Sequence, residues 1–240
     1  MSDISALINQ LVAANRILAH ENVVDAFGHI SARHPDDSGR FLLSRSLAPE
    51  LIEAGDVMTF NLDGSPVNDT RKAYLERFIH GAIYEARPDV HSIVHSHSRS
   101  VVPFSVTNVP IRPLMHSTGA VGVPPVWDFQ SKFGDTDLLV TSMQIGRDLA
   151  AALGNNATAL MRGHGSVAVG STVKAAVYIA VYLEVNAELQ LKASALGPIT
   201  YLTPKEVELT THQVKLPDGS MGVGVDRTWD YWCRRAGVKG

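Results

Sequence analysis

Three histidines fall within seven positions of the segment VHSIVHSHSR, residues 90–99. An Arg-Pro-Asp turn precedes them, and the alternation of apolar and polar residues predicts a strand over residues 92–98. Residues i and i+2 of a strand point to the same face, so we expect His95 and His97 to converge on one point. Neutral imidazole is the commonest metal ligand in proteins. A lone His-x-His pair is also common without any metal, so it predicts a metal site and an ordinary strand about equally.

Two other segments carry residues that could complete such a site. Glu76 and His80 are four residues apart in YLERFIHGAIYEAR, residues 74–87, whose apolar spacing predicts an amphipathic helix that ends at the following proline. This helix leads directly into the strand with the histidines. His164 stands between two glycines in MRGHGSV, where glycine permits a tight turn. A solvated carboxylate and a turn histidine are the alternatives. Together, three imidazoles and a carboxylate predict a divalent-metal site.

The rest of the chain must position these residues, and it alternates predicted helices and strands. Helices are expected at residues 4–20, 74–87, 136–154 and 172–197, and strands at residues 29–35, 40–44, 56–65 and 92–98, with a strand-turn-strand unit at 157–170. Residues 108–128 are rich in proline and glycine and predict an ordered loop. This alternation favours an α/β fold with one central sheet, and short connections favour antiparallel pairs in it.

Bulk composition excludes several classes of protein. The net charge of the 240-residue chain is -3 with neutral histidines, and no basic run stands out, so nucleic acid is not an expected partner. Cys233 is the only cysteine, which excludes an intrachain disulfide and fits a reducing compartment. The N-terminus lacks the features of a signal peptide, and no apolar run approaches the roughly 20 residues that span a membrane. We expect a cytoplasmic protein with a single domain over residues 1–240.

The combined motif resembles a known family. The order E-R-F-I-H-x3-Y-x2-R-P-D-V-x-x-I-V-H-x-H, followed by G-H-G at residues 163–165, resembles the class II aldolase and adducin family. The similarity runs from about residue 5 to about residue 200. The resemblance implies a three-layer α/β/α sandwich around a mostly antiparallel sheet. It also implies a homotetramer with active sites at subunit interfaces.

The resemblance also implies roles for individual residues. His95, His97 and His164 match the metal ligands, and Glu76 matches the acidic residue that serves as acid/base. His80 matches a supporting position behind the ligands on the same helix. One divalent ion per subunit is implied, and a set of three imidazoles and a carboxylate suits zinc, manganese, cobalt or iron.

Three loops depart from the sugar-phosphate members of the family, which hold phosphate with small polar residues. Here the segments read FGHIS at residues 27–31, SRSL at residues 44–47 and YL at residues 74–75. A phenol and an isobutyl group replace a serine pair, which removes short donors that favour phosphate. Arg45 supplies a planar fork suited to a carboxylate. We therefore expect a flatter, less charged substrate that carries carboxylate. The residues predicted to bind this small-molecule substrate are Arg45, His29, Ser31, Ser44 and Tyr74.

Four segments carry a closer resemblance: FGHIS, FLLSRSLAPELI, ERFIHGAIYEARPDV and IVHSHSRSVVPFSV. They are most similar to the branch of the family that decarboxylates hydroxylated aromatic or heteroaromatic acids, such as dihydroxyphthalate and pyridine-dicarboxylate decarboxylases. The resemblance implies a lyase in which a metal acts as Lewis acid and Glu76 carries the proton. His116, in LMHSTG, is expected as a second catalytic donor, with a loop histidine bonded to the backbone as the alternative.

Other functions remain open on the same scaffold. One is an aldolase that acts on a small sugar-like or hydroxy-keto acid, and another is a metal-dependent epimerase or dehydratase. A non-catalytic adducin-like scaffold is a further alternative, although a scaffold has no need for three histidines and Glu76. In the C-terminal segment, residues 200–240, the aromatic run RTWDYWCRR is expected either to cap a neighbouring subunit's site or to pack on its own subunit.

Overall fold

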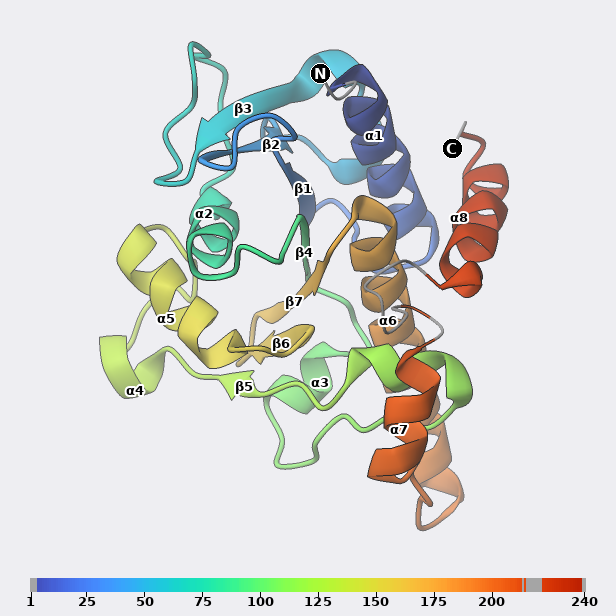
Figure 1. Cartoon of the computed structure of the whole chain (residues 1–240). Coiled ribbons are helices and arrows are strands. Elements are labelled where there is room, and N and C mark those ends of the chain that lie inside the picture. Colours follow the sequence, from blue (N-terminus) through green and yellow to red (C-terminus); the bar gives the residue numbers. More distant parts are fainter. Residues whose placement is uncertain (1–3, 213, 215–221, 239–240) are drawn as a thin grey trace.

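The computed structural model describes residues 4–212, 214 and 222–238 of the chain. Its centre is a seven-stranded sheet in the order β3-β2-β1-β4-β7-β6-β5 (Figure 1). Neighbouring strands are antiparallel, except that β5 and β6 are parallel. The strands are β1 His29–Arg33, β2 Arg40–Ser44, β3 Val57–Asn61, β4 Ser92–Ser96, β5 Val126–Trp127, β6 Thr158–Met161 and β7 Gly165–Gly170.

Helices cover both faces of the sheet and complete a three-layer sandwich, which confirms the expected fold (Figure 1). On one side lie α1 (Ile4–His20) and α6 (Val173–Leu196), with α8 (Val223–Arg235) packed against them. On the other side lie α2 (Arg77–Ala86) and α5 (Met143–Leu153). The shorter helices are η1 Pro49–Leu51, η2 Ala54–Asp56, α3 Val102–Ser105, η3 His116–Val121, α4 Gln130–Phe133 and α7 Pro204–Thr211.

Successive side chains of β1 point alternately to the two faces of the sheet, each of which packs against helices. Ile30 and Ala32 pack in the core formed with α1 and α6. Because successive residues of a strand point to opposite faces, His29, Ser31 and Arg33 are directed at the α2 side. These three side chains are buried, and each makes hydrogen bonds with residues of α2. A row of buried polar groups thus lies between β1 and α2.

Two expected helices begin later than predicted. The helix expected over residues 74–87 begins at Arg77, because Glu76 has φ -92° and ψ 19° and lies outside the helix. The helix expected over residues 136–154 begins at Met143, where Ser142 accepts a hydrogen bond from the backbone of Ile145 and caps it. Before that cap, Leu138 has a positive φ of 64°, which is incompatible with a helix.

The strand expected over residues 92–98 ends at Ser96, so His97 lies beyond it. The strand expected over residues 29–35 likewise ends at Arg33. The loop expected over residues 108–128 contains η3 and the short β5. The long helix expected over residues 172–197 is confirmed as α6, whose N-terminus is capped by the side chain of Thr172.

The aromatic run near the C-terminus packs on its own subunit. In α8, Trp229 and Trp232 are buried in the core with α1 and α6, while Tyr231 is 56% exposed. Within the segment 200–240, residues 213, 215–221 and 239–240 lie outside the described residues. The contact of this segment with a neighbouring subunit stays a prediction. In the part of the chain that the structure describes, no helix combines the length and the apolar character that crossing a membrane requires.

Candidate metal centre and active site

Three imidazole nitrogens from separate parts of the chain meet at one end of β4. His95 lies in β4, His97 follows the strand, and His164 lies in the turn between β6 and β7. The Nε2 atom of His97 lies 3.1 Å from Nε2 of His95 and 2.9 Å from Nε2 of His164. Together with the carboxylate of Glu76, the four groups offer ligand atoms within 4.8 Å of one another. The structure therefore brings together all four residues that the motif singles out.

Backbone carbonyls orient two of these rings. His95 Nδ1 lies 3.1 Å from the carbonyl oxygen of Ser166, and His164 Nδ1 lies 2.9 Å from that of Leu138. A carbonyl only accepts, so each Nδ1 carries hydrogen and donates it. In the neutral ring this leaves the Nε2 lone pair directed at the cluster.

Glu76 is anchored beside the histidines by one of its oxygens. The backbone N–H of Val140 donates to Oε1 of Glu76 at 3.0 Å. Its Oε2 lies 3.4 Å from Nε2 of both His95 and His164. Burial alone would raise the pKa of Glu76, but hydrogen bonds and charge from His164 and His95 outweigh it and hold the pKa well below its usual range. Glu76 is therefore a carboxylate in this setting.

The arrangement fits a bound divalent cation. Nitrogen ligands about 2.0–2.1 Å from a tetrahedral ion lie roughly 3.3 Å from one another, and the observed separations are 2.9–3.4 Å. Lone pairs and a carboxylate that face each other repel unless a proton or a cation lies between them. Burial, followed by the charges of His95 and His164, lowers the pKa of His97 to about 4. The neutral, metal-binding form of His97 is favoured at neutral pH.

A cavity of about 560 Å³ opens beside this cluster. Glu76, His97 and His29 contribute polar atoms to its wall. Most of the remaining wall is apolar or aromatic, and includes the phenol ring of Tyr74. The other lining residues are Ala26, Phe27, Gly28, Ser46, Leu47, Ala48, Leu75 and Leu139.

His29 lines the cavity, and three further polar side chains stand in a row behind it. Its Nδ1 lies 2.7 Å from Nε2 of His80, and His80 Nδ1 lies 2.6 Å from Oγ of Ser31. Ser31 Oγ lies in turn 2.8 Å from the hydroxyl of Tyr84. Burial, followed by the charges of neighbouring histidines, lowers the pKa of His29 and lowers that of His80 to about 3. Ser31 was predicted to bind substrate, but it is fully buried and adjoins the cavity only through His80 and His29.

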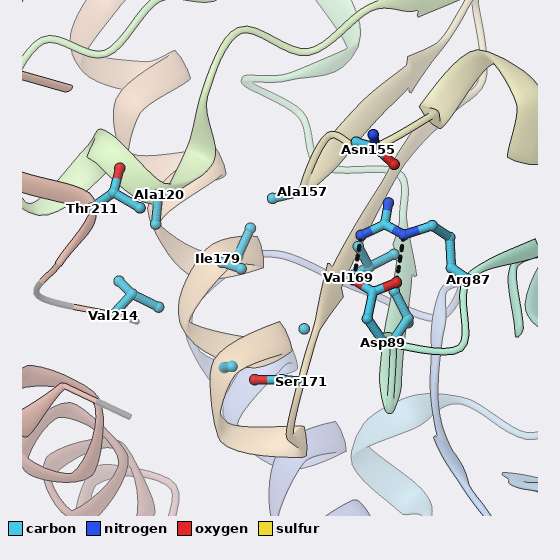
Figure 2. A pocket seen from close by; sticks show the side chains of 13 residues that line it. Arg87, Asp89, Ala120, Asn155, Ala157, Val169, Ser171, Ile179, Thr211 and Val214 are labelled. Atoms are coloured by element: carbon cyan, nitrogen blue, oxygen red, sulfur yellow. Dashed lines mark hydrogen bonds and ion pairs between the residues drawn. The ribbon is translucent and has the colours of Figure 1, made fainter. Parts of the chain in front are cut away.

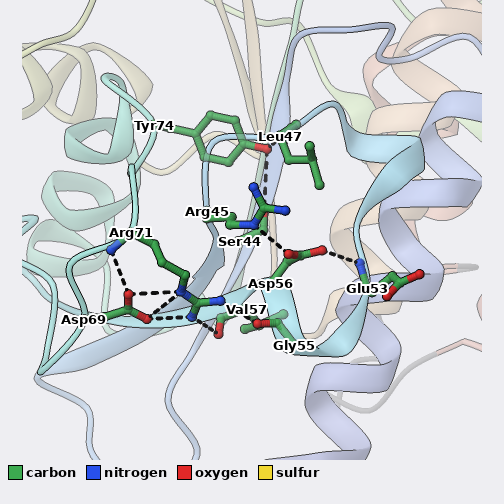
Figure 3. Close-up of polar contacts among 10 residues, drawn as sticks. All are labelled: Ser44, Arg45, Leu47, Glu53, Gly55, Asp56, Val57, Asp69, Arg71 and Tyr74. Carbon is green, nitrogen blue, oxygen red and sulfur yellow. Dashed lines mark hydrogen bonds and ion pairs between the residues drawn. The ribbon is translucent and has the colours of Figure 1, made fainter.

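Arg45 is held by an acidic partner (Figure 3). Its Nε donates to Oδ1 of Asp56 at 2.6 Å, and the backbone N–H of Glu53 donates to the other carboxylate oxygen. The Glu53 bond, and after it the Arg45 bond, lowers the pKa of Asp56. Arg45 is not among the described residues that line the cavity, so a substrate carboxylate would compete with Asp56 for its guanidinium.

Tyr74 and Ser44 belong to one small network beside the cavity. The hydroxyl of Tyr74 donates to the carbonyl oxygen of Leu47 and accepts from Oγ of Ser44 at 3.3 Å. Burial raises the pKa of Tyr74. The network holds the phenol ring in the wall of the cavity, so Ser44 supports Tyr74 from behind.

His116 lies apart from this cavity. It is exposed in η3, with its Nε2 3.4 Å from Oγ of Ser117, and it is not among the described residues of the cavity wall. Its catalytic role stays a prediction. The site is also oriented by backbone groups of Val140, Leu138 and Ser166, which the sequence does not reveal. Backbone atoms carry no residue-type signal, so only the folded chain shows them.

Another cavity, of about 220 Å³, lies beside α6 (Figure 2). The ion pair between Arg87 and Asp89 stands at one side, at 2.8 Å, and apolar residues such as Ile179 stand at the other. None of the residues singled out by the sequence lines this cavity, and we assign it no chemistry.

Comparisons with known proteins agree with the geometry. Residues 9–191 match the model of the Class II Aldolase and Adducin N-terminal domain. The chain is similar to the decarboxylase tropJ of Talaromyces stipitatus, with 34% identity over 97% of this chain and 95% of that protein. It is also similar to the 3,4-dihydroxyphthalate decarboxylase of Arthrobacter keyseri, with 29% identity over 78% of each chain. Both relatives are decarboxylases, which confirms the expected branch.

A solved structure with the same fold is the L-fuculose 1-phosphate aldolase from Glaciozyma antarctica. Its TM-score is 0.77 with 26% identity, over 99% of this chain and 94% of that one. The likeness extends over nearly the whole of both chains, so the three-layer fold found here is that of a family with lyase members.

Proposed function

We propose, from the premise that this chain belongs to the class II aldolase and adducin family, that it is a divalent-metal-dependent carbon–carbon lyase. Its proposed reaction is the non-oxidative decarboxylation of a hydroxylated aromatic or heteroaromatic acid, a step of aromatic-compound catabolism. The observation that carries the proposal is the convergence of three Nε2 atoms and one carboxylate beside a cavity with largely apolar walls. The decarboxylase relatives support the same choice.

His95, His97 and His164 are proposed to hold one ion of zinc, manganese, cobalt or iron. When bound, the ion would supply Lewis acidity and a fixed point of attachment for substrate oxygens. The backbone carbonyls of Ser166 and Leu138 orient the rings of His95 and His164 through hydrogen bonds that involve no substrate atom. The site is thus prepared for binding before the reaction begins.

The cavity wall suits a flat ring better than a phosphorylated sugar. Phe27, Leu47 and Leu75 offer apolar surface, and the phenol of Tyr74 is fixed by its bond to the Leu47 carbonyl. Phosphate is favoured by several short donors around a dianion, whereas Tyr74 and Leu75 supply bulk. A ring that carries a hydroxyl and a carboxylate can lie against this wall with its polar edge toward Glu76 and His97.

Glu76 is proposed to move the proton. As a carboxylate anchored through Oε1, it can accept the proton of the substrate hydroxyl at Oε2 and return it to the ring carbon that bears the carboxylate. The carbon–carbon bond to that carboxylate then breaks, its electron pair restores the aromatic ring, and carbon dioxide leaves. The product oxygen regains a proton from solvent, so the net reaction consumes one proton and releases one carbon dioxide.

A second candidate is an aldolase on a small sugar-like or hydroxy-keto acid substrate. The similarity to a fuculose 1-phosphate aldolase structure favours it, and a metal held by the same three histidines could serve either reaction. The two candidates differ in the substrate that the cavity wall must accommodate, a flat aromatic ring or a sugar-like chain. A homotetramer in the cytoplasm with active sites at subunit interfaces completes the proposal, and His116 is proposed to approach the active site in that assembly.

The two candidates are separated by a screen of product release. The purified, metal-loaded chain is given an ortho-hydroxy aromatic acid, the matched acid without the hydroxyl, and fuculose 1-phosphate. Carbon dioxide is expected from the hydroxy acid alone. Efficient cleavage of the sugar phosphate, with no carbon dioxide from any hydroxylated acid, would replace the decarboxylase proposal with the aldolase.

A further inference from the structure

The hydrogen bonds in the row of buried polar groups behind His29 all run in one donor-to-acceptor direction, and the distances show which. The hydroxyl of Tyr84 has two neighbouring acceptors, Oγ of Ser31 at 2.8 Å and the carbonyl oxygen of His91 at 3.5 Å. Hydroxyl hydrogen bonds have donor–acceptor distances of about 2.5–3.0 Å. The hydrogen of Tyr84 is therefore assigned to the bond with Ser31.

That assignment fixes the remaining hydrogens one by one. Ser31 accepts from Tyr84, so its own hydrogen goes to Nδ1 of His80 at 2.6 Å. A neutral imidazole whose Nδ1 accepts carries its hydrogen on Nε2, and His80 is fully buried, which disfavours the charged form. His80 Nε2–H then donates to Nδ1 of His29 at 2.7 Å. The hydrogen of His29 is left on Nε2.

We propose that Tyr84, Ser31 and His80 fix His29 in the tautomer whose Nε2–H donates into the cavity, toward a carboxylate of the substrate. His29 lines that cavity, and among the described residues its Nε2 has no hydrogen-bond partner. Tyr84, Ser31 and His80 are positioning residues, since they touch the cavity only through His29. The opposite direction would give His29 a lone pair there, and with it a base or an additional metal ligand.

The Nε2–H of neutral His29 is suited to an anionic oxygen. A protonated His29 would repel a cation bound by the nearby histidines, whereas the neutral ring carries no net charge. Its N–H still forms a charge-assisted bond with a carboxylate oxygen. Loss of a hydrogen bond to a charged group weakens binding by roughly tenfold to a hundredfold. This inference rests on the proposed function for the identity of the substrate, a hydroxylated aromatic acid with a second carboxylate. The tautomer itself does not depend on it.

The tautomer is read by nuclear magnetic resonance of the zinc-loaded full chain with ¹⁵N-labelled histidine. The His29 signals are assigned by their loss in His29→Gln. We expect a pattern of two-bond couplings that shows hydrogen on Nε2. Ser31→Ala is expected to give a mixture of tautomers, whereas Ser92→Ala is expected to keep the wild-type pattern. Ser92 is the matched control, because it is a buried serine of the neighbouring strand whose hydroxyl donates to the Ser31 carbonyl, outside the row. Hydrogen on Nδ1 of His29 in the wild type would overturn the inference.

Recognition of the carboxylate is measured by calorimetric binding to the zinc-loaded chain. A hydroxylated aromatic dicarboxylate and its monocarboxylate analogue are compared. We expect His29→Leu to raise Kd for the dicarboxylate by roughly tenfold to a hundredfold and to leave Kd for the analogue nearly unchanged. His29→Gln is expected to restore most of the affinity, because its amide can donate from a similar place.

Equal losses for both ligands in His29→Leu, or no binding of the dicarboxylate to the wild type, would overturn the carboxylate role. Neither experiment requires turnover. If the chain binds the dicarboxylate through His29 and releases no carbon dioxide, the proposed reaction fails while this inference stands.

Discussion

Gly165 lies where any side chain would collide with the strand that carries His95. A Cβ atom built on Gly165 would lie 2.1 Å from the carbonyl oxygen of Ser96 and 3.0 Å from Cδ2 of His97. Ordinary contact begins at 3.4 Å, so this Cβ would lie about 1.3 Å too close to a backbone atom, and alanine here forces β4 and β7 to move relative to each other. Metal sites tolerate changes of only about 0.2 Å in ligand distance. The Gly165→Ala substitution must therefore disturb both the sheet and the metal centre.

The expected effect has two parts. Overpacking of this kind costs about 1–3 kcal/mol, so the free energy of unfolding of the metal-free Gly165→Ala protein should fall by that amount. Its metal content after dialysis should fall well below one ion per chain. The assays are urea unfolding in the presence of a chelator and elemental analysis of the dialysed protein. The matched control is Gly55→Ala, because a Cβ at Gly55 meets nothing within 4 Å; its stability should stay within about 0.5 kcal/mol of the wild type. Wild-type stability and metal content in Gly165→Ala would refute this account of how β4 and β7 position His97.

Three further predictions concern substrate, pH and assembly. If Arg45 binds a substrate carboxylate, Arg45→Ala should lower kcat/KM for a hydroxy-aromatic acid by at least about a hundredfold at normal metal content. Unchanged kinetics would show that Arg45 serves only to pair with Asp56. Because burial lowers the pKa of His80 to about 3 from 6.5, the unfolded chain binds more protons between these values, and the stability of the metal-free protein should fall as pH is lowered through that range. His80→Gln should reduce the slope of unfolding free energy against pH by one proton, and an unchanged slope would contradict the lowered pKa of His80. The tetramer predicts a sedimentation mass near four times 25.9 kDa, and a mass near that of one chain would exclude it.

The metal centre was the part of the site most accessible from sequence. Spacing and residue type singled out His95, His97, His164 and Glu76, and the fold brings them together. The expected position of His97 on the strand is wrong, because the strand ends at Ser96. His97 reaches the cluster from beyond the strand, where the short-range pattern gave no information about the direction of the chain.

The partners of the remaining residues could not be predicted, because they depend on long-range contacts. Arg45 was interpreted from its type alone, and its pairing with Asp56 arises from the approach of η2 to the end of β2. Ser31 was placed at the substrate through its loop, yet the pleat of β1 directs it at His80. The polar alternation of His29, Ser31 and Arg33 was the available signal for a buried polar row, since such groups on one strand face need partners.

The start of one helix was predictable from a local signal, whereas the start of another depends on a long-range contact. The cap at Ser142 is a local signal that could have shortened the helix expected over residues 136–154. The start of α2 was not accessible in this way, because Glu76 is withdrawn from the helix by its bond to the backbone of Val140. That bond is part of the candidate site, so the apolar spacing of residues 74–87 predicted the wrong helix start at Glu76, a residue of the site.

A metal held by His95, His97 and His164 is proposed to allow this chain to decarboxylate a hydroxylated aromatic acid. The most direct measurement is a titration of the chelator-treated enzyme with a divalent ion, with carbon dioxide release and bound metal followed on the same samples. We expect release to be absent without metal, to rise in proportion to bound ion and to saturate at one ion per chain. We expect the His95→Ala/His97→Ala double variant neither to bind metal nor to release carbon dioxide. Carbon dioxide release that persists after complete removal of metal, or in the double variant, would show that the reaction does not depend on this metal centre.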